Sequence, residues 1–448
     1  MSVYPLTGAV RPYAWGSRTV IASLQGRPTP TETPEAELWL GAHPGNPSTV
    51  AGKDGPVSLD TLIAGDPNGQ LGASVASAFG PRLPFLLKVL AAEAPLSLQA
   101  HPSSEYARTA YAKQEADPAL PKNYTDAYHK PEMLVALTEF SALCGFRSPQ
   151  VSAEVLASFG ISALDPVVAS LRAGDLRGAV EALLTWPADS RPALIDAVVA
   201  AARGADELTA AGAEAALAAA GVDAALASAS AEAAFGAGAA HAAAVPGKDD
   251  YALALDLAAH YPGDPGVLVA LLLNHVRLAP GEAIWMPAGN LHAYLHGAGV
   301  ELMAASDNVL RGGLTPKRVD VGELLNVLVF EVLDDPILPS TPVGPGIVTW
   351  EVPVPDFTLY RLDLDGTLPP LEVPAHGPRI VLCTDGEVFV GESLDGTPVE
   401  VLAGGAAYAP ADAGHIKVAG KGQVFVAAVP SDPTPQKLAW SVQPLTVE

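Results

Sequence analysis

The stretch GEAIWMPAGNLHAYLHG, residues 281–297, decides the fold expected for this chain. Gly281, Pro287, Gly289 and His292 are separated in turn by five, one and two residues. The glycines permit tight turns, and the proline suits a bulge or a sheet edge, where no backbone N–H is needed. His292 would then point into a small β-barrel, where a metal ion can sit. The alternative is a surface hairpin with an incidental histidine.

This spacing resembles the second signature motif of the cupin jelly roll, and we favour that interpretation because all the spacing constraints match together. Near the C-terminus, GGAAYAPADAGH (residues 404–415) repeats part of the pattern. The preceding CTDGEVFVGE (residues 383–392) contains no histidine pair. We therefore expect a second jelly roll without a metal site.

The pattern of strand-like and helix-like segments divides the chain into three parts. Residues 1–147 and 261–330 contain short strand-like runs broken by proline and glycine, and are expected to form the metal-binding cupin domain. Residues 148–260 show helical spacing, with Pro, Asp or Ser at the expected helix starts, which predicts an inserted α-helical domain. Residues 331–448 predict a cupin-like β domain without a metal site. The predicted fold class is mainly β with an α-helical insert, as two cupin-type jelly-roll barrels plus a helical domain.

Composition limits the possible partners. The 448 residues have a formal net charge of −24, which argues against binding nucleic acid or an anionic membrane. VLVALLL (residues 267–273) is far shorter than the roughly 20 apolar residues that cross a bilayer. The cysteines, Cys144 and Cys383, are too few for a disulfide framework, and no apolar signal segment is visible at the N-terminus. We expect a cytoplasmic protein that acts as a monomer.

The segment PLSLQAHPSSEYA (residues 95–107) places two polar side chains in an apolar surrounding. If it is a strand, Gln99 and His101 share one face and can converge on a metal ion. The alternative is a strand that leaves the core and meets water. A metal site needs three or four ligands, and His292 offers a third.

Glu132 in AYHKPEMLVAL is the nearest candidate for a fourth ligand. It stands at the start of an apolar strand, where an unpaired carboxylate would be costly. The alternative is an ordinary salt bridge with Lys130 or Arg147. Two histidines, a glutamate and a glutamine oxygen suit Zn²⁺, with Mn²⁺, Fe²⁺ and Co²⁺ as further options.

Four segments together are similar to the type I mannose-6-phosphate isomerase (phosphomannose isomerase) family. They are VRPYAWGS…AELWLGAHPGNPS, PLSLQAHPSSEYA, YTDAYHKPEMLVALTEFSALCGFR and a long block that includes VELMAASDNVLRGGLTPK. The last of these belongs to that family and not to cupins in general. The resemblance covers the first 147 residues and about 258–330.

This resemblance implies an activity and a set of site residues. Family members interconvert mannose 6-phosphate and fructose 6-phosphate, which would feed mannose and GDP-mannose metabolism. It implies one Zn²⁺ per chain, with the ligands Gln99, His101, Glu132 and His292, and an essential arginine at Arg311.

The chain departs from the family pattern at two places. The family commonly has Asp-Lys where this chain has Ser103 and Ser104, and often Asn where this chain has Tyr128. Neither change affects an expected ligand, and both bear on substrate preference.

Aldose–ketose isomerisation moves a proton between C1 and C2 through an enediol, so it needs a base, an electrophile and a phosphate anchor. Arg311 could stabilise the enediolate, and Lys130 and Glu301 are candidate proton-transfer groups, with His129 as a third. Lys88 is expected on a solvated strand face. The candidate substrate-binding residues are Ser97, His129, Lys317 and Arg318.

Three other functions are possible from the sequence. Another metal-dependent cupin enzyme, such as a dioxygenase, is disfavoured by a Gln ligand and by NVLRGGLTPK. A non-catalytic sugar-phosphate-binding cupin would have lost a ligand or Arg311, and both are present. A structural or storage cupin would not need a basic cluster near a metal in so acidic a chain.

Overall fold

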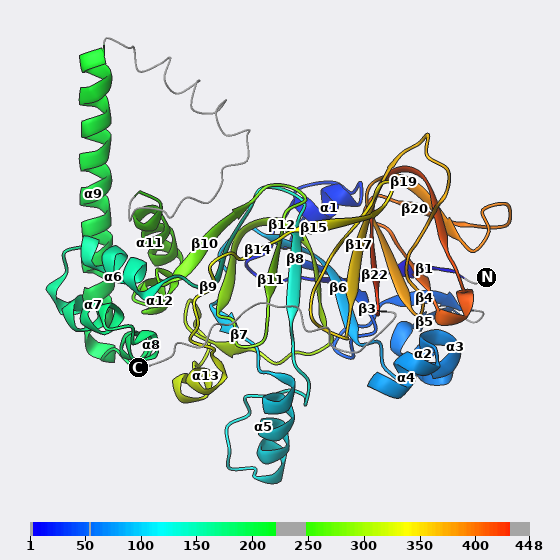
Figure 1. The fold of residues 1–448 in the computed structure, drawn as a ribbon, viewed down its shortest axis with the longest axis horizontal. Coiled ribbons are helices and arrows are strands. Elements are labelled where there is room, and N and C mark those ends of the chain that lie inside the picture. Colours follow the sequence, from blue (N-terminus) through cyan, green and yellow to red (C-terminus); the bar gives the residue numbers. More distant parts are fainter. Residues whose placement is uncertain (1–2, 53–54, 221–247, 431–448) are drawn as a thin grey trace.

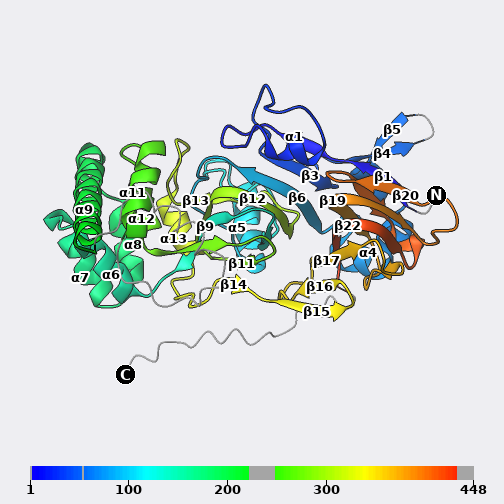
Figure 2. The same cartoon turned by 90° about the horizontal axis from the view of Figure 1, so that it is seen from above.

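The structure is a computed structural model that describes residues 3–52, 55–220 and 248–430. Helices, a first sheet and a second sheet follow one another along the longest axis of the molecule (Figures 1 and 2). The alanine-rich end of the predicted helical insert (221–247) and the end of the C-terminal segment (431–448) lie outside the described residues.

Sheet I is an antiparallel sheet in the middle of the molecule. Its main path runs β14-β11-β8-β12-β6-β3-β2, while β9 and β7 also pair with β12, β10 with β9, and β13 with β7. Its strands are β2 (Ala9–Arg11), β3 (Glu37–Gly41), β6 (Phe85–Ala92), β7 (Gln99–Ala100), β8 (Glu132–Ala136), β9 (Phe140–Phe146), β10 (Leu273–Leu278), β11 (Ala283–Met286), β12 (His292–Ala304), β13 (Leu310–Arg311) and β14 (Ile337–Leu338).

Strand β12 joins two halves of sheet I, and its partners change at Gly297. Residues before Gly297 pair with β9 and β7, and residues from Gly297 on pair with β6 and β8. Gly297 has φ +114°, and a Cβ there would lie 2.5 Å from the Glu139 carbonyl oxygen. Only glycine tolerates both conditions, so this residue allows one strand to serve two half-sheets.

Sheet II contains strands from both ends of the chain. Its main path runs β15-β16-β17-β22-β19-β21-β1-β4-β5, with β18 on β22 and β20 on β19. The predicted division at residues 147, 260 and 330 therefore describes order along the chain and not sheet membership. The strands are β1 (Tyr4–Thr7), β4 (Thr49–Gly52), β5 (Gly55–Ser58), β15 (Ser340–Gly344), β16 (Ile347–Trp350), β17 (Thr358–Asp365), β18 (Leu371–Glu372), β19 (Arg379–Gly391), β20 (Val399–Leu402), β21 (Ala406–Ala409) and β22 (Lys417–Ala428).

The two sheets share a hydrophobic core. Alternation along β8 sends Met133 and Val135 into this core, together with Trp350 and Phe357 from the sheet II side. Glu132 and Leu134 point the other way, into the interior of sheet I. One strand thus forms the wall between the core and a polar interior.

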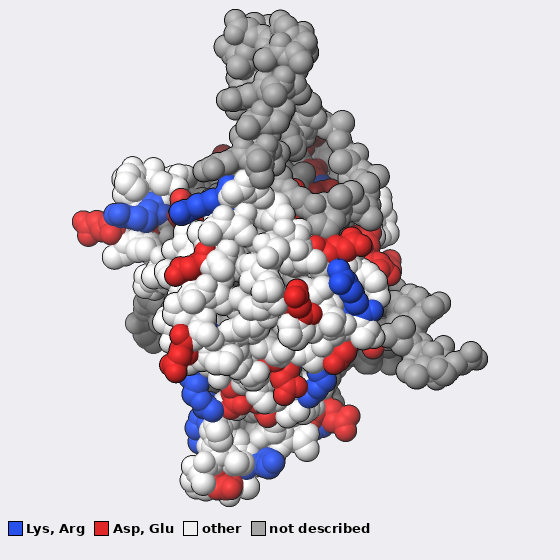
Figure 3. Space-filling view, turned by 90° about the vertical axis from the view of Figure 1, so that its left-hand side faces the viewer, with Lys and Arg blue, Asp and Glu red and all other residues white. Residues whose placement is uncertain are grey.

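Most helices gather at one end of the molecule (Figure 1). As the sequence predicted, serine and aspartate cap helices here: Ser148 Oγ accepts from Val151 N–H, and Asp175 from Gly178 N–H. In Figure 3, Lys and Arg are scattered among Asp and Glu on the described part of this end. The helices of the chain are α1 (Val20–Leu24), α2 (Leu59–Gly65), α3 (Pro67–Leu71), α4 (Ala73–Phe79), α5 (Ser104–Ala116), α6 (Pro149–Ser158), α7 (Asp165–Arg172), α8 (Leu176–Leu184), α9 (Arg191–Ala220), α11 (Lys248–His260), α12 (Gly266–Ala270) and α13 (Val321–Val327).

Among the described residues, no helix combines the length and apolar character needed to cross a bilayer.

His275 on β10 should make the stability of the fold pH-dependent. Its Nε2 lies 2.9 Å from Ser141 Oγ, and burial lowers its pKa to about 4 from 6.5. The unfolded chain binds more protons between these values, so stability falls as the pH falls through this window. In His275→Gln, this acid-side loss should be smaller by on the order of 1–2 kcal/mol near pH 4.

Urea unfolding of the metal-free proteins between about pH 7 and pH 4 measures this difference. His415→Gln removes an exposed histidine and serves as the control. Parallel pH curves for wild type and His275→Gln would contradict the prediction.

Candidate active site and metal centre

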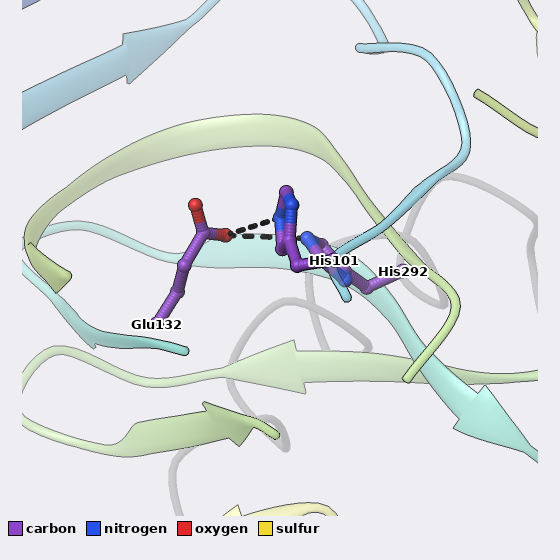
Figure 4. A group of neighbouring side chains, drawn as sticks. All are labelled: His101, Glu132 and His292. Carbon is purple, nitrogen blue, oxygen red and sulfur yellow. Dashed lines mark ion pairs between the residues drawn. The ribbon is translucent and has the colours of Figure 1, made fainter. Parts of the chain in front are cut away.

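Three buried side chains converge inside sheet I. His101 follows β7, while Glu132 and His292 are the first residues of β8 and β12. The Oε2 atom of Glu132 lies 3.4 Å from His101 Nε2 and 3.2 Å from His292 Nε2. One carboxylate oxygen therefore faces both imidazole rings (Figure 4). All three side chains are at most 1% exposed.

Backbone carbonyls orient both rings. His101 Nδ1 lies 2.7 Å from the Asn308 carbonyl oxygen, and His292 Nδ1 lies 3.2 Å from that of Asn290. Because a carbonyl can only accept, each Nδ1 carries the proton and donates it. Each Nε2 is left with a free lone pair directed at Glu132, which is the tautomer of a metal-ligating histidine.

The donor set fits a cation. His101 Nε2, His292 Nε2 and Glu132 Oε2 are all buried without a hydrogen-bond partner, which is costly unless something else satisfies them. Burial lowers the pKa of His101 to about 4 against the opposing effect of Glu132, so the ring is neutral at pH 7. Within the described residues, this is the one group of three or more His, Cys, Asp or Glu side chains whose ligand atoms all lie within 4.8 Å of one another.

Lys130 occupies the other oxygen of Glu132. Its Nζ lies 2.7 Å from Oε1. The salt bridge that the sequence analysis gave as an alternative is therefore present, and it leaves Oε2 facing the two histidines. Burial alone would raise the pKa of Glu132, but the Lys130 cation outweighs it and holds this pKa well below its usual range. Glu132 is thus an anion whose Oε2 faces the Nε2 atoms of His101 and His292.

Gln99 and Arg311 lie beside the metal-facing histidines. Gln99 is directly opposite His292 on one side and Arg311 on the other, so the three side chains share one face. Burial lowers the pKa of Arg311, and among the described residues no carboxylate forms an ion pair with it. Its charge is therefore available to an anion in the site.

Comparisons with known proteins agree with this geometry. Residues 3–149 match the family model of the phosphomannose isomerase type I catalytic domain. The mannose-6-phosphate isomerase of Salmonella typhimurium is 34% identical over 425 residues, covering 94% of this chain and 97% of the relative. The chain belongs to the type I phosphomannose isomerase family. The human mannose-6-phosphate isomerase is 32% identical over 432 residues, covering 90% of this chain and 92% of the relative.

The fold of this chain is also similar to solved structures of phosphomannose isomerases. A mutant of phosphomannose isomerase from Salmonella typhimurium superposes with a TM-score of 0.80 at 30% identity, covering 96% of this chain and 100% of that one. A mannose 6-phosphate isomerase bound with zinc and yttrium gives a TM-score of 0.79 with the same identity and coverage. The predicted fold class, mainly β with cupin-type barrels and a helical part, is confirmed.

A buried charge cluster that the sequence analysis missed lies in the same interior. Lys88 Nζ is 2.9 Å from Glu301 Oε2 and 3.3 Å from Glu37 Oε1. Tyr294 O–H donates to Glu301 and Trp39 Nε1–H to Glu37, at 2.8 Å each. The expectation that Lys88 lies on a solvated face is wrong, since the residue is 5% exposed. The apolar run around it was the available signal, because both faces of such a strand are buried.

One lysine between two carboxylates leaves an excess of negative charge. Burial lowers the pKa of Lys88, but Glu301 and Glu37 outweigh it, so this pKa is raised and the lysine stays a cation. Burial raises the pKa of Glu301; Lys88 opposes this, and the carboxylates of Glu132 and Glu37 add to the rise. Glu301 is therefore a buried carboxyl group with a raised pKa beside a lysine cation.

Asn308 is a second residue that the sequence analysis missed. It is 1% exposed, and its side chain donates to the Tyr128 and Asp126 carbonyls and accepts from Thr125 N–H, each at 2.8 Å. Its own carbonyl accepts from His101. Asn308 therefore joins the 125–128 loop to a metal-facing histidine. No sequence spacing predicts this role, because the partners are about 180 residues away.

The predicted substrate-binding residues have mixed surroundings. Arg318 is exposed and pairs with Asp320 at 2.9 Å, and Lys317 is also exposed. Ser97 is half-buried in the segment before β7. The His129 ring bonds to Asp356 of the sheet II side. Their roles toward substrate stay predictions.

The departure at Ser103 has a structural explanation. Its Oγ accepts from Tyr106 N–H at 3.2 Å, so the serine caps helix α5 directly after the His101–Pro102 turn. Serine and aspartate cap helices equally well, so this part of the departure preserves the local backbone.

Replacing Lys88 with Met should destabilise the protein by about 3–5 kcal/mol, because it leaves Glu37 and Glu301 buried without their cation. Adding Glu301→Gln should restore part of this loss by removing one of the two charges. Urea unfolding of the single and double variants measures both effects. Lys113→Met, on the exposed face of α5, is the control. A Lys88→Met protein within about 1 kcal/mol of wild type would refute the interpretation.

Proposed function

We propose that this chain is a zinc-dependent aldose–ketose isomerase that interconverts D-mannose 6-phosphate and D-fructose 6-phosphate. The observation that supports this most is the unsatisfied His101–Glu132–His292 group beside Arg311, in a member of the phosphomannose isomerase family. Its relatives in that family are mannose-6-phosphate isomerases, and one was solved with zinc. The product would enter mannose and GDP-mannose metabolism.

One Zn²⁺ per chain would be held by His101, Glu132 and His292, with Gln99 as the fourth ligand. When bound, it would supply a Lewis acid for the sugar carbonyl and hydroxyl oxygens. Lys130 keeps Glu132 ionised, and the Asn308 and Asn290 carbonyls keep both histidines in the ligating tautomer. These residues set the charge and direction of the donors before any substrate arrives.

The proton moves between C1 and C2 through an enediol, and two groups of this chain can carry it. Glu301 has a raised pKa and a hydrogen bond from Tyr294, which suits a carboxyl group that takes and returns a proton. Lys130 can donate to a sugar oxygen from its place beside Glu132. Arg311 would stabilise the enediolate oxygen. Ser97, Lys317 and Arg318 are the proposed phosphate contacts, and Arg318 would have to leave Asp320 to bind it.

A coupled assay of mannose 6-phosphate conversion to fructose 6-phosphate tests the proposal. The assay compares untreated protein, chelator-treated protein and chelator-treated protein with Zn²⁺ restored. Activity that disappears with the chelator and returns with Zn²⁺ is expected. A folded, zinc-loaded protein without turnover would exclude the isomerase assignment.

Arg311→Ala should lower kcat by about 10²–10³, because it removes a charge from the developing oxyanion. The melting temperature and the zinc affinity should stay unchanged. Arg311→Lys should recover only part of the rate, since an ammonium cannot reproduce the guanidinium geometry. Arg172→Ala, at the exposed end of α7, is the matched control. An Arg311→Ala enzyme within about twofold of the wild-type kcat would remove this residue from the mechanism.

A further inference from the structure

A buried carboxylate from the sheet II side contacts the segment that leads into β8. Asp356 lies just before β17, is 2% exposed, and places Oδ2 2.8 Å from His129 Nε2. His129 is 21% exposed and immediately precedes Lys130. The contact joins residues 227 positions apart in the chain.

The segment is held from both sides. His129 reaches outward to Asp356, while Lys130 reaches inward to Glu132 Oε1 at 2.7 Å. The Pro131 carbonyl accepts from Ala304 N–H at 3.1 Å, which fixes the backbone between them and the first residue of β8. Because the two adjacent side chains are anchored to different carboxylates, loss of the His129–Asp356 contact would remove one of the two anchors that set the position of Lys130.

The partner of His129 is itself rigidly placed. Phe357, the next residue after Asp356, is fully buried and packs edge-on against Trp285 with ring centroids 6.3 Å apart. Trp285 on β11 lies opposite Met133 on β8. Asp356 is thus anchored to the same strand pair that carries Glu132. A buried carboxylate is costly without a close partner, so the geometry of this pair is under strong constraint.

We propose that Asp356 is a positioning residue for the isomerase site: it holds the His129 imidazole and thereby keeps Lys130 aligned on Glu132. The inference rests on the proposed function. In this proposal, a residue just before β17 of sheet II helps to position the site, whereas the metal-facing side chains come from sheet I and the residue that follows β7.

A second histidine–carboxylate pair provides a matched control. His415 Nδ1 lies 2.7 Å from Glu372 Oε1, also in the C-terminal segment, but these side chains are 62% and 52% exposed. An exposed pair of this kind contributes little to stability. Glu372→Gln therefore removes the same type of contact without disturbing a buried site.

The test compares Asp356→Asn, Glu372→Gln and Phe357→Leu with wild type. Zinc dissociation constants come from competition with a chromogenic chelator, and kcat, KM and melting temperatures are measured on the same proteins. Asp356→Asn should weaken zinc binding about tenfold and lower kcat about tenfold with a smaller change in KM. Glu372→Gln should stay within about twofold of wild type in every quantity.

A double-mutant cycle with His129→Gln tests whether Asp356 acts through the histidine. Asp356→Asn should cause little further loss in a His129→Gln background, so the double variant should match His129→Gln alone, and additive losses would overturn the proposal. Equal zinc affinity and kcat in wild type and Asp356→Asn would also overturn it. Phe357→Leu loosens the packing between the two sheets but keeps the Asp356 carboxylate. If it lost as much zinc affinity and kcat as Asp356→Asn, at an equal drop in melting temperature, the proposal would also be overturned.

The two proposals fail in different ways. If the zinc-loaded wild type does not isomerise mannose 6-phosphate, the proposed function is wrong. The ratio of zinc affinities between wild type and Asp356→Asn, and its coupling to His129, then decide the role of Asp356 without any activity measurement.

Discussion

The carboxylate of Glu132 is the constraint on which the site depends. A fully buried carboxylate is stable only if both of its oxygens have partners, and here the two oxygens have different ones. Lys130 neutralises one, and the other faces two imidazole lone pairs that a cation would join. The pairing of β7 with β12, together with the backbone carbonyls that accept from both histidine Nδ1 atoms, directs the two Nε2 atoms at this one oxygen.

Residues with local signals were predictable from the sequence. The glycines, proline and histidine of the 281–297 stretch indicated turns around an inward-pointing ligand, and an acidic residue opening an apolar strand indicated Glu132. Helix α5 begins at a serine cap, and α13 begins after Asp320, as their capping residues suggest. For the two helices, the deciding interaction lies within a few residues of the signal.

Contacts between distant segments were not predictable in the same way. Lys88 finds its carboxylates on β3 and β12, and Asn308 finds its partners in the 125–128 loop. Strands β1, β4 and β5 join sheet II because of pairing across the whole chain, which no local pattern encodes. Such partners depend on topology, so a sequence indicates only that a buried polar group needs one.

The pairing of β1 with β21 has a consequence for how the chain is made. Tyr4 lies opposite Tyr408, so about 400 residues separate the two partners. At the usual pace of a ribosome, β1 waits roughly 20–80 s before its neighbour emerges. During that time it can pair with β4, through Leu6 and Val50, but its other edge stays open to a neighbouring nascent chain. A chaperone that binds the paired strands β1 and β4 during synthesis would protect this edge from pairing with another chain.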